Sequence, residues 1–472
     1  MNKNKELAKN TAIISVGKFC TQFLSFLLLP FYTSILSTTE YGTVDLLITY
    51  QQLIGYIVFF QIEQAIFRFL VEVRNKKEDA SKIITSCMGF AVGQSVILGI
   101  IMCMINTFIN IQYWNYLFAY VVAVIMSGCM LQIARGFGKN FVYALGSFIS
   151  AIVTIVLNIL FLAVFKMRVT GMLLAYILGS SVCALTVFFI LKVYKYISTV
   201  SFNRKTLRMC LLYSLPLVPN VLSWWVMSAS DRTIVAFFLG TAYNGVLTVA
   251  NKFPGAYSAF YTVFNLSWTE SAVIHINDDD AEQFFKSVIE RVYRLFSAVA
   301  VGLLACLPFV FNFLVNVNYH EAYYQVPIYM LASLCQVFQG MYSVIYIALK
   351  KTKEVAKSTV ISAIINFLVC ILLINSIGLY ASSISTLISY LFLCIWRYND
   401  LKKYLYVRFN MKLLGSTIVA FVVVCFGYYS HSFIMKVIIL IFVVIYSCYI
   451  NRDVVLIIIK SPKNIKKTIT GK

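Results

Sequence analysis

The sequence has little charge for its length. Only 12% of its 472 residues are Asp, Glu, Lys or Arg, while 61% are hydrophobic. A soluble chain of this size needs far more charged surface, so a soluble fold is excluded. The apolar residues come in long runs, and about 20 apolar residues span a bilayer core of about 30 Å as a helix. The composition therefore indicates a membrane protein throughout.

The apolar runs predict an all-α polytopic membrane protein with about fourteen transmembrane helices. We place them at residues 8–36, 41–69, 81–107, 113–134, 141–165, 170–194, 209–239, 243–273, 287–315, 323–349, 356–375, 378–397, 412–430 and 433–451. The basic start of the chain resembles a signal peptide. Its apolar run is too long and lacks a cleavage site, so it is interpreted as the first helix.

Acidic residues are also scarce, which leaves a formal net charge of +21. The basic residues gather in alternate loops, and only Lys166, Arg168 and Lys436 fall in the loops assigned to the outside. Such a bias places both termini in the cytoplasm. The basic charge therefore orients the chain in the membrane, and a nucleic-acid partner is rejected.

Metal and disulfide chemistry have no support. The twelve cysteines are scattered through the predicted helices, and none lies in an outer loop. The three histidines, His275, His320 and His431, are far apart in the sequence. No disulfide, zinc site or other cofactor is expected.

Two short motifs recur in the same order in the two halves of the chain. LSTTEYG at 36–42 matches LGTAYNG at 239–245, and ISAI at 149–152 recurs at 361–364. The matches predict two parallel six-helix repeats, which form two lobes in transporters that work by alternating access. We divide the chain into an N-lobe (1–197), a cytoplasmic linker (198–208), a C-lobe (209–403) and two last helices with a basic tail (404–472).

Proline is rare, with only seven residues. Pro30, Pro216 and Pro219 fall in the first helix of each half, and Pro254 falls in the eighth helix. Proline kinks a helix because it removes a backbone hydrogen bond. These kinks are either static features of packing or hinges that gate one side.

Ionisable residues inside the predicted helices are few and costly to bury in a membrane. Lys18 and Lys252 lie deep in the first and eighth helices, one in each half, and favour a site for an anionic substrate such as a phosphate. Asp231 and Arg232 adjoin in the seventh helix, where they either neutralise each other or serve the substrate. Three further residues, Glu63, Arg68 and Glu270, are candidates for ion pairs or for coupling to H+ or Na+.

An enzyme is not expected. The Gly17-Lys18 pair lacks the other residues of a nucleotide-binding loop. A glycan polymerase or ligase would need a substantial outer loop with catalytic Arg or His, and no outer loop of that size is present. A transporter is therefore the favoured class.

The opening helices, KNTAIISVGKFCTQFLSFLLLPFYTSILSTTEYGTVDLL, resemble those of the polysaccharide transporters. These are the O-antigen and capsule flippases of the multidrug/oligosaccharidyl-lipid/polysaccharide exporter (MOP) superfamily. YSLPLVPNVLSWWVMSASDRTIVAFFLG at 213–240 and IEQAIFRF at 62–69 match the same family. The resemblance implies two six-helix lobes in a V shape, in a bacterial cytoplasmic membrane. It also makes Lys18 the counterpart of a basic residue in the cationic cavity of related lipid II flippases.

The implied substrate is an undecaprenyl-pyrophosphate-linked oligosaccharide, moved from the inner to the outer leaflet. Lys18, Lys252 and Arg232 would hold its phosphates. Membrane lipids and other polysaccharide assembly proteins are the implied partners. The same superfamily contains cation-coupled multidrug exporters, which is the alternative. The sequence does not identify the glycan or the coupling ion.

Overall fold

A computed structural model describes residues 26–109, 111–405 and 410–453. These residues form helices and no strand. In chain order, the first helices are α2 (Leu29–Ile35), α3 (Thr38–Phe59), α4 (Ile62–Leu70), α5 (Lys77–Phe108), α6 (Trp114–Gly136), α7 (Asn140–Ile159), α8 (Arg168–Ile190), α9 (Arg204–Ser214) and α10 (Val218–Phe238). They are followed by α11 (Thr241–His275), α12 (Ala281–Leu314), α13 (Glu321–Ala348), α14 (Thr352–Ile377), α15 (Tyr380–Leu401), α16 (Met411–Tyr429) and α17 (Phe433–Ile450).

The predicted all-α membrane fold is confirmed. Every predicted span from 41–69 to 433–451 coincides with a helix or with consecutive helices in the described ranges. Within the described ranges, ten helices are long and apolar enough to cross a membrane, or up to eleven when the bent pair α3–α4 counts as one span. The total of fourteen stays a prediction, because most of the first predicted helix lies outside the described residues.

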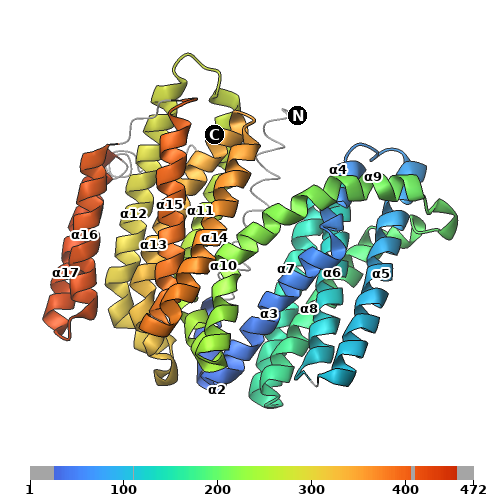
Figure 1. The fold of residues 1–472 in the computed structure, drawn as a ribbon, viewed down its shortest axis with the longest axis horizontal. Helices are drawn as coiled ribbons and strands as arrows, with labels where there is room; N and C mark the ends of the chain where they lie inside the picture. The colour runs from blue at the N-terminus through green and yellow to red at the C-terminus, as the bar shows by residue number, and fades with distance from the viewer. Residues whose placement is uncertain (1–25, 110, 406–409, 454–472) are drawn as a thin grey trace, which may run out of the picture. The chain divides into compact units, whose positions relative to one another are not determined.

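The chain forms two compact units (Figure 1). The first comprises residues 1–252 and 359–385, and the second comprises 253–358 and 386–472. The boundary falls within α11, α14 and α15, so it differs from the four-part division expected from the sequence. The predicted lobe boundaries stay a prediction.

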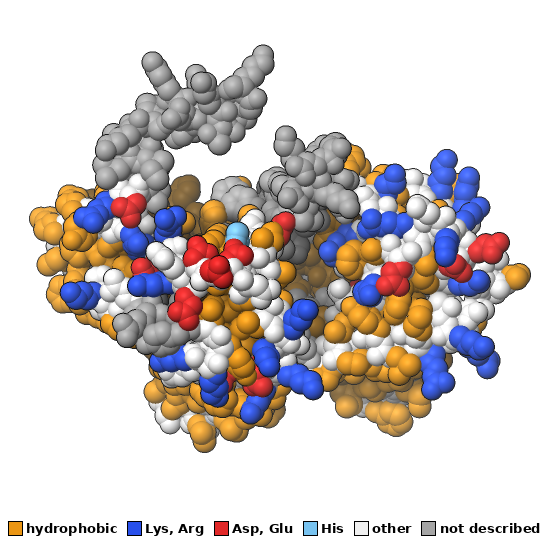
Figure 2. Space-filling view, turned by 90° about the horizontal axis from the view of Figure 1, so that it is seen from above, with side chains coloured by type: hydrophobic (Ala, Val, Ile, Leu, Met, Phe, Trp, Pro, Cys, Tyr) orange, Lys and Arg blue, Asp and Glu red, His pale blue; other side chains and the backbone are white. Residues whose placement is uncertain are grey.

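Loops that the charge bias assigns to one side of the membrane meet in the first unit. Arg74 Nε, after α4, donates a hydrogen bond to the carbonyl of Gly136 at 2.6 Å, and Thr85 Oγ1 donates to the carbonyl of Tyr196 at 3.0 Å. At the opposite ends of these helices, Arg168 forms an ion pair of 2.9 Å with Glu40. Both groups agree with the predicted alternation of the loops. Figure 2 looks onto a face where Lys and Arg are widely spread.

The second unit shows the same agreement. At one end, the hydroxyl of Tyr346 donates to Asp400 at 2.9 Å, and Lys403 Nζ donates to the same carboxylate at 2.6 Å. This hydrogen bond raises the pKa of Lys403, which lies just beyond α15. At the other end, the hydroxyls of Tyr323 and Tyr428 each donate to the other residue's carbonyl, at 2.6 and 2.8 Å. This reciprocal pair fastens α16 to α13.

The second predicted helix is broken. Its segments α3 and α4 meet at a bend of 60°, where Phe60 and Gln61 have φ angles of 51° and 55°. Neither residue is a glycine, so each left-handed conformation costs about 1–3 kcal/mol, which the surrounding packing must offset. The segment contains no proline at this point, and the sequence therefore predicted one continuous span.

Candidate functional site

The two repeat motifs lie against each other in the first unit. A Cβ atom on Gly42 would overlap the carbonyl oxygen of Thr241 and come within 2.7 Å of the nitrogen of Gly245. A Cβ atom on Gly245 would in turn overlap the carbonyl oxygen of Thr38. Only glycine permits backbones this close. The final glycine of each motif therefore seats the start of one helix on the start of its counterpart.

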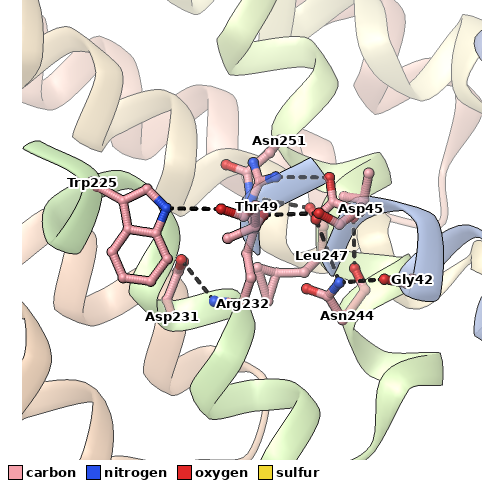
Figure 3. Close-up of polar contacts among 10 residues, drawn as sticks. Gly42, Asp45, Thr49, Trp225, Asp231, Arg232, Asn244, Leu247 and Asn251 are labelled. Atoms are coloured by element: carbon pink, nitrogen blue, oxygen red, sulfur yellow. Dashed lines mark hydrogen bonds and ion pairs between the residues drawn. The ribbon is translucent and has the colours of Figure 1, made fainter. Parts of the chain in front are cut away.

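A buried ion pair joins these two helix starts to α10. Arg232 Nη1 donates to Asp45 Oδ1 at 2.7 Å, and Asp45 lies one helical turn after Gly42 (Figure 3). Asn244 Nδ2 donates to the carbonyl of Gly42 at 2.9 Å and lies 3.4 Å from Asp45 Oδ2. The side chain of Asp45 is only 9% exposed, so the ion pair with the guanidinium offsets part of the cost of burying its charge.

A second contact ties α10 to α3. Trp225 Nε1 donates to the carbonyl of Thr49 at 3.1 Å, about two turns from the ion pair along α10 (Figure 3). Trp225 and Arg232 are seven residues apart and therefore lie on one face of the helix. This face of α10 packs along α3.

Asp231 and Arg232, adjacent in sequence, serve different neighbours. The carboxylate of Asp231 is fully within the bundle and accepts a hydrogen bond from the hydroxyl of Ser382 on α15. It also accepts the backbone N–H of Arg232 at 2.9 Å (Figure 3). Successive helical residues point in different directions, so the guanidinium reaches Asp45 while the carboxylate reaches Ser382.

Lys252 lies on α11 and is half-buried. The charges of both Asp45 and Arg232 act on it, which places it close to the ion pair. Asp45, Asp231, Arg232, Lys252, Asn244 and Ser382 together form what we call the polar cluster. Its two acidic and two basic side chains give a formal charge of zero. The predicted site for an anionic substrate therefore does not follow from the charge of this cluster alone.

The predicted site residues Glu63, Arg68 and Glu270 are not members of the polar cluster. Lys18 lies outside the described residues. Arg68 forms an exposed ion pair with Glu72 at 2.6 Å. Glu63 follows the break between α3 and α4, and Glu270 is half-buried on the part of α11 that belongs to the second unit. Their functional roles stay predictions.

The four candidate hinge prolines lie at helix starts or within helices. Pro30 occupies the first turn of α2, and Pro219 occupies the first turn of α10. Pro216 lies in the short 3₁₀ turn, residues 215–217, that separates α9 from α10. Pro254 is inside α11, just past the boundary between the units. A hinge function is not tested by these positions.

Two ionisable residues within the helices were not among the predicted site residues. Asp45 is an acidic residue in an apolar span, and that signal alone marks it as a candidate. Arg397 is the last residue of the predicted span 378–397, yet its side chain is fully buried in the second unit. It donates to Ser358 Oγ at 3.1 Å, to the carbonyl of Val355 at 3.3 Å and to the side-chain oxygen of Gln339.

The sequence matches the polysaccharide biosynthesis protein family over residues 7–269, which is more than half of the chain. The chain belongs to this family. The match contains both repeat motifs at 36–42 and 239–245 and all members of the polar cluster except Ser382. The resemblance read from the first, second and seventh helices is thereby confirmed.

Solved structures share the fold. The lipid II flippase MurJ, in an inward closed conformation, matches with a TM-score of 0.69 at 15% identity, over 95% of this chain and 100% of its own. An inward-facing multidrug resistance MATE family transporter of the MOP superfamily matches with a TM-score of 0.65 at 15% identity, covering 83% and 99%. An outward-facing transporter of that family gives 0.58 at 14% identity, covering 84% and 97%. No curated protein matches the sequence.

Proposed function

We propose that this protein is a flippase for an undecaprenyl-pyrophosphate-linked oligosaccharide, a repeat unit of O-antigen, capsule or another surface polysaccharide. It acts by alternating access in the bacterial cytoplasmic membrane, from the inner to the outer leaflet. The observation that carries the proposal is the family match over residues 7–269. The fold alone is shared by the MurJ flippase and by MATE transporters, so it supports a transporter without choosing the substrate.

The polar cluster supplies the charges for the proposed site. Arg232, Lys252 and Lys18 hold the pyrophosphate. Without substrate, Asp45 is paired with the guanidinium of Arg232, and a phosphate competes with Asp45 for that guanidinium. Lysine offers a point charge in place of a bidentate clamp, which suits a substrate that must be released again. The lipid tail stays in the bilayer while the head group passes.

In the proposed movement, the helices bend at their prolines, while the glycine contact between the repeats stays in place. Pro30, Pro216, Pro219 and Pro254 interrupt the backbone hydrogen bonds of the helices that would rock. The contact between Gly42 and Gly245 brings two backbones together with no side chain between them. It therefore serves as the fixed point about which the repeats move.

Reconstitution tests the function directly. Purified protein in liposomes that carry a lipid-linked oligosaccharide should make the sugar accessible on the far side. Protein-free liposomes and liposomes with an unrelated membrane protein set the background. Failure to exceed that background would overturn the flippase proposal. Export of amphipathic cationic drugs in its place would support the alternative, a cation-coupled multidrug exporter.

Removing charge tests the proposed site. Lys18→Ala and Lys252→Ala should each lower translocation in liposomes and surface glycan production in cells. Lys353→Ala removes an exposed lysine in the first turn of α14 and serves as the matched control. If both site variants translocate as well as the control, the phosphate-binding role of these lysines is refuted.

A further inference from the structure

Glu63 lies in an unusual place. It is the second residue of α4, directly after the break at Phe60 and Gln61. Broken helices in transporters tend to mark sites for coupling ions, because irregular backbone at membrane depth is kept where it serves a cavity or ligand. The carboxylate of Glu63, next to the bend, is therefore a candidate site for a coupling ion.

One oxygen of the Glu63 carboxylate, Oε2, is buried without a hydrogen-bond partner in the described ranges. No Lys or Arg in the described ranges forms an ion pair with it. A buried charge left in this state is costly, and a group that can take up a proton avoids the cost by doing so.

Two weakly acidic groups on helices next to Glu63 lie within reach of its charge. Helix α4 packs against α5, α6 and α9. The groups coupled electrostatically to Glu63 are Tyr56 on α3 and Cys129 on α6, which is fully buried. The buried thiols of α5 and α9, Cys87 and Cys210, interact with each other.

The basic residues described on α4 and at the end of α6 have other partners. On α4 itself, Arg68 is paired with Glu72. At the end of α6, the guanidinium of Arg135 lies 4.4 Å from the ring centre of Phe67 and donates to Gln132. The remaining charged side chains of α5 and α9 form no hydrogen bond or ion pair with Glu63 within the described residues: Lys77, Glu78, Asp79, Lys82, Arg204, Lys205 and Arg208.

We propose that Glu63 is a proton-binding site built into the break between α3 and α4, and that it carries the coupling proton of the proposed flippase. Binding converts the carboxylate to a neutral carboxyl group, and release returns the same proton. A metal ion needs several oxygen ligands, and no group of three or more acidic, Cys or His side chains is found among the described residues. A proton needs only the one carboxylate.

The position explains how a proton would move the helix. The ionised carboxylate prefers water or the helix N-terminus, while the neutral acid tolerates apolar surroundings. Because Glu63 is next to the break, a change in its charge acts where the backbone already turns by 60°. Loading and release of the proton would therefore favour different bends of α3 on α4.

The first experiment measures the proton site without substrate. Infrared difference spectra of the purified full-length protein are recorded across a pH titration, and the carbonyl band of a protonated carboxylic acid is followed. We expect a titrating band that is lost in Glu63→Gln, shifted in Glu63→Asp and kept in Glu78→Gln, an exposed control at the start of α5. A band unchanged in Glu63→Gln overturns the proposal. So does a Glu63 that stays ionised throughout, as in an ion pair with Lys18.

The second experiment measures coupling in liposomes. Translocation of the lipid-linked oligosaccharide is compared with and without a proton gradient. The ratio should exceed unity for the unsubstituted protein, Glu63→Asp and Glu78→Gln, and fall to unity for Glu63→Gln. Stimulation by a sodium gradient alone overturns the proton role. This inference rests on the proposed flippase only for the second experiment; without any translocation, the infrared titration still decides the proton site.

Discussion

Each unit holds an arginine among its helices, partly exposed Arg232 in the first and fully buried Arg397 in the second, and the two have different partners. In the first unit, Arg232 meets the carboxylate of Asp45 at 2.7 Å. In the second, Arg397 donates to Gln339, Ser358 and a backbone carbonyl, which carry no charge. A carboxylate cancels the charge of a guanidinium, whereas amides and hydroxyls only replace its hydration. The desolvation cost of placing a guanidinium among helices can therefore be offset either by an ion pair or by neutral polar groups.

The largest effect is expected from Asp45→Asn. This change leaves the guanidinium of Arg232 without its carboxylate, and breaking a buried pair on one side costs about 3–5 kcal/mol. Thermal or denaturant unfolding in detergent measures the loss. Arg232→Gln on the Asp45→Asn background should cost less than the two single changes added together. Additive losses would show that the pair contributes nothing as a pair.

A smaller effect comes from the glycines at the helix contacts of each unit. Gly245→Ala places a methyl group on the backbone of Thr38, with an expected loss of about 1–3 kcal/mol. Gly340→Ala in the second unit meets the end of the Tyr261 side chain, which can shift. The unfolding free energy should therefore fall less for Gly340→Ala. An equal loss would contradict a special backbone contact in the first unit.

Gln339→Glu gives Arg397 a carboxylate partner of the kind that Arg232 has in Asp45. A carboxylate in place of the amide gives Arg397 a charge-assisted partner, and a gain of about 1 kcal/mol in unfolding free energy is expected. Gln339→Ala removes the acceptor and should destabilise the protein. If Gln339→Glu unfolds as easily as Gln339→Ala, the space around Arg397 admits only a neutral amide.

Trp225→Phe should have the smallest effect. It removes the hydrogen bond to the carbonyl of Thr49 and keeps most of the ring, with an expected loss of about 1 kcal/mol. The same unfolding assay measures it beside Asp45→Asn. A loss as large as that of Asp45→Asn would mean that the indole, and not the ion pair, is the main polar link between α10 and α3.

The sequence predicted most of the helical architecture, because long apolar runs and the positions of basic residues follow from the membrane itself. Partners within the membrane were harder to predict. Asp231 and Arg232 are adjacent in the sequence, and their hydrogen bonds to Ser382 and to Asp45 could not be foreseen from that adjacency. The partner of a buried charge depends on which helices lie beside it, and short motifs do not encode that.

The break after α3 could not be predicted for a related reason. Phe60 and Gln61 are ordinary residues, and neither glycine nor proline marks the turn. The burial of Arg397 could not be predicted either, since a basic residue at a helix end usually reaches the membrane surface. Both features are imposed by neighbouring helices, so they appear only when the tertiary structure is known.

The contact between Gly42 and Gly245 also bears on how such a chain could arise. Each glycine faces the opening turn of the other's helix, at Thr241 and Thr38. A contact in which equivalent surfaces meet reciprocally is isologous, the kind that joins identical subunits in a two-fold dimer. A single six-helix ancestor could pair with its own copy through this one glycine. Gene duplication and fusion would then preserve a dimer interface inside one polypeptide.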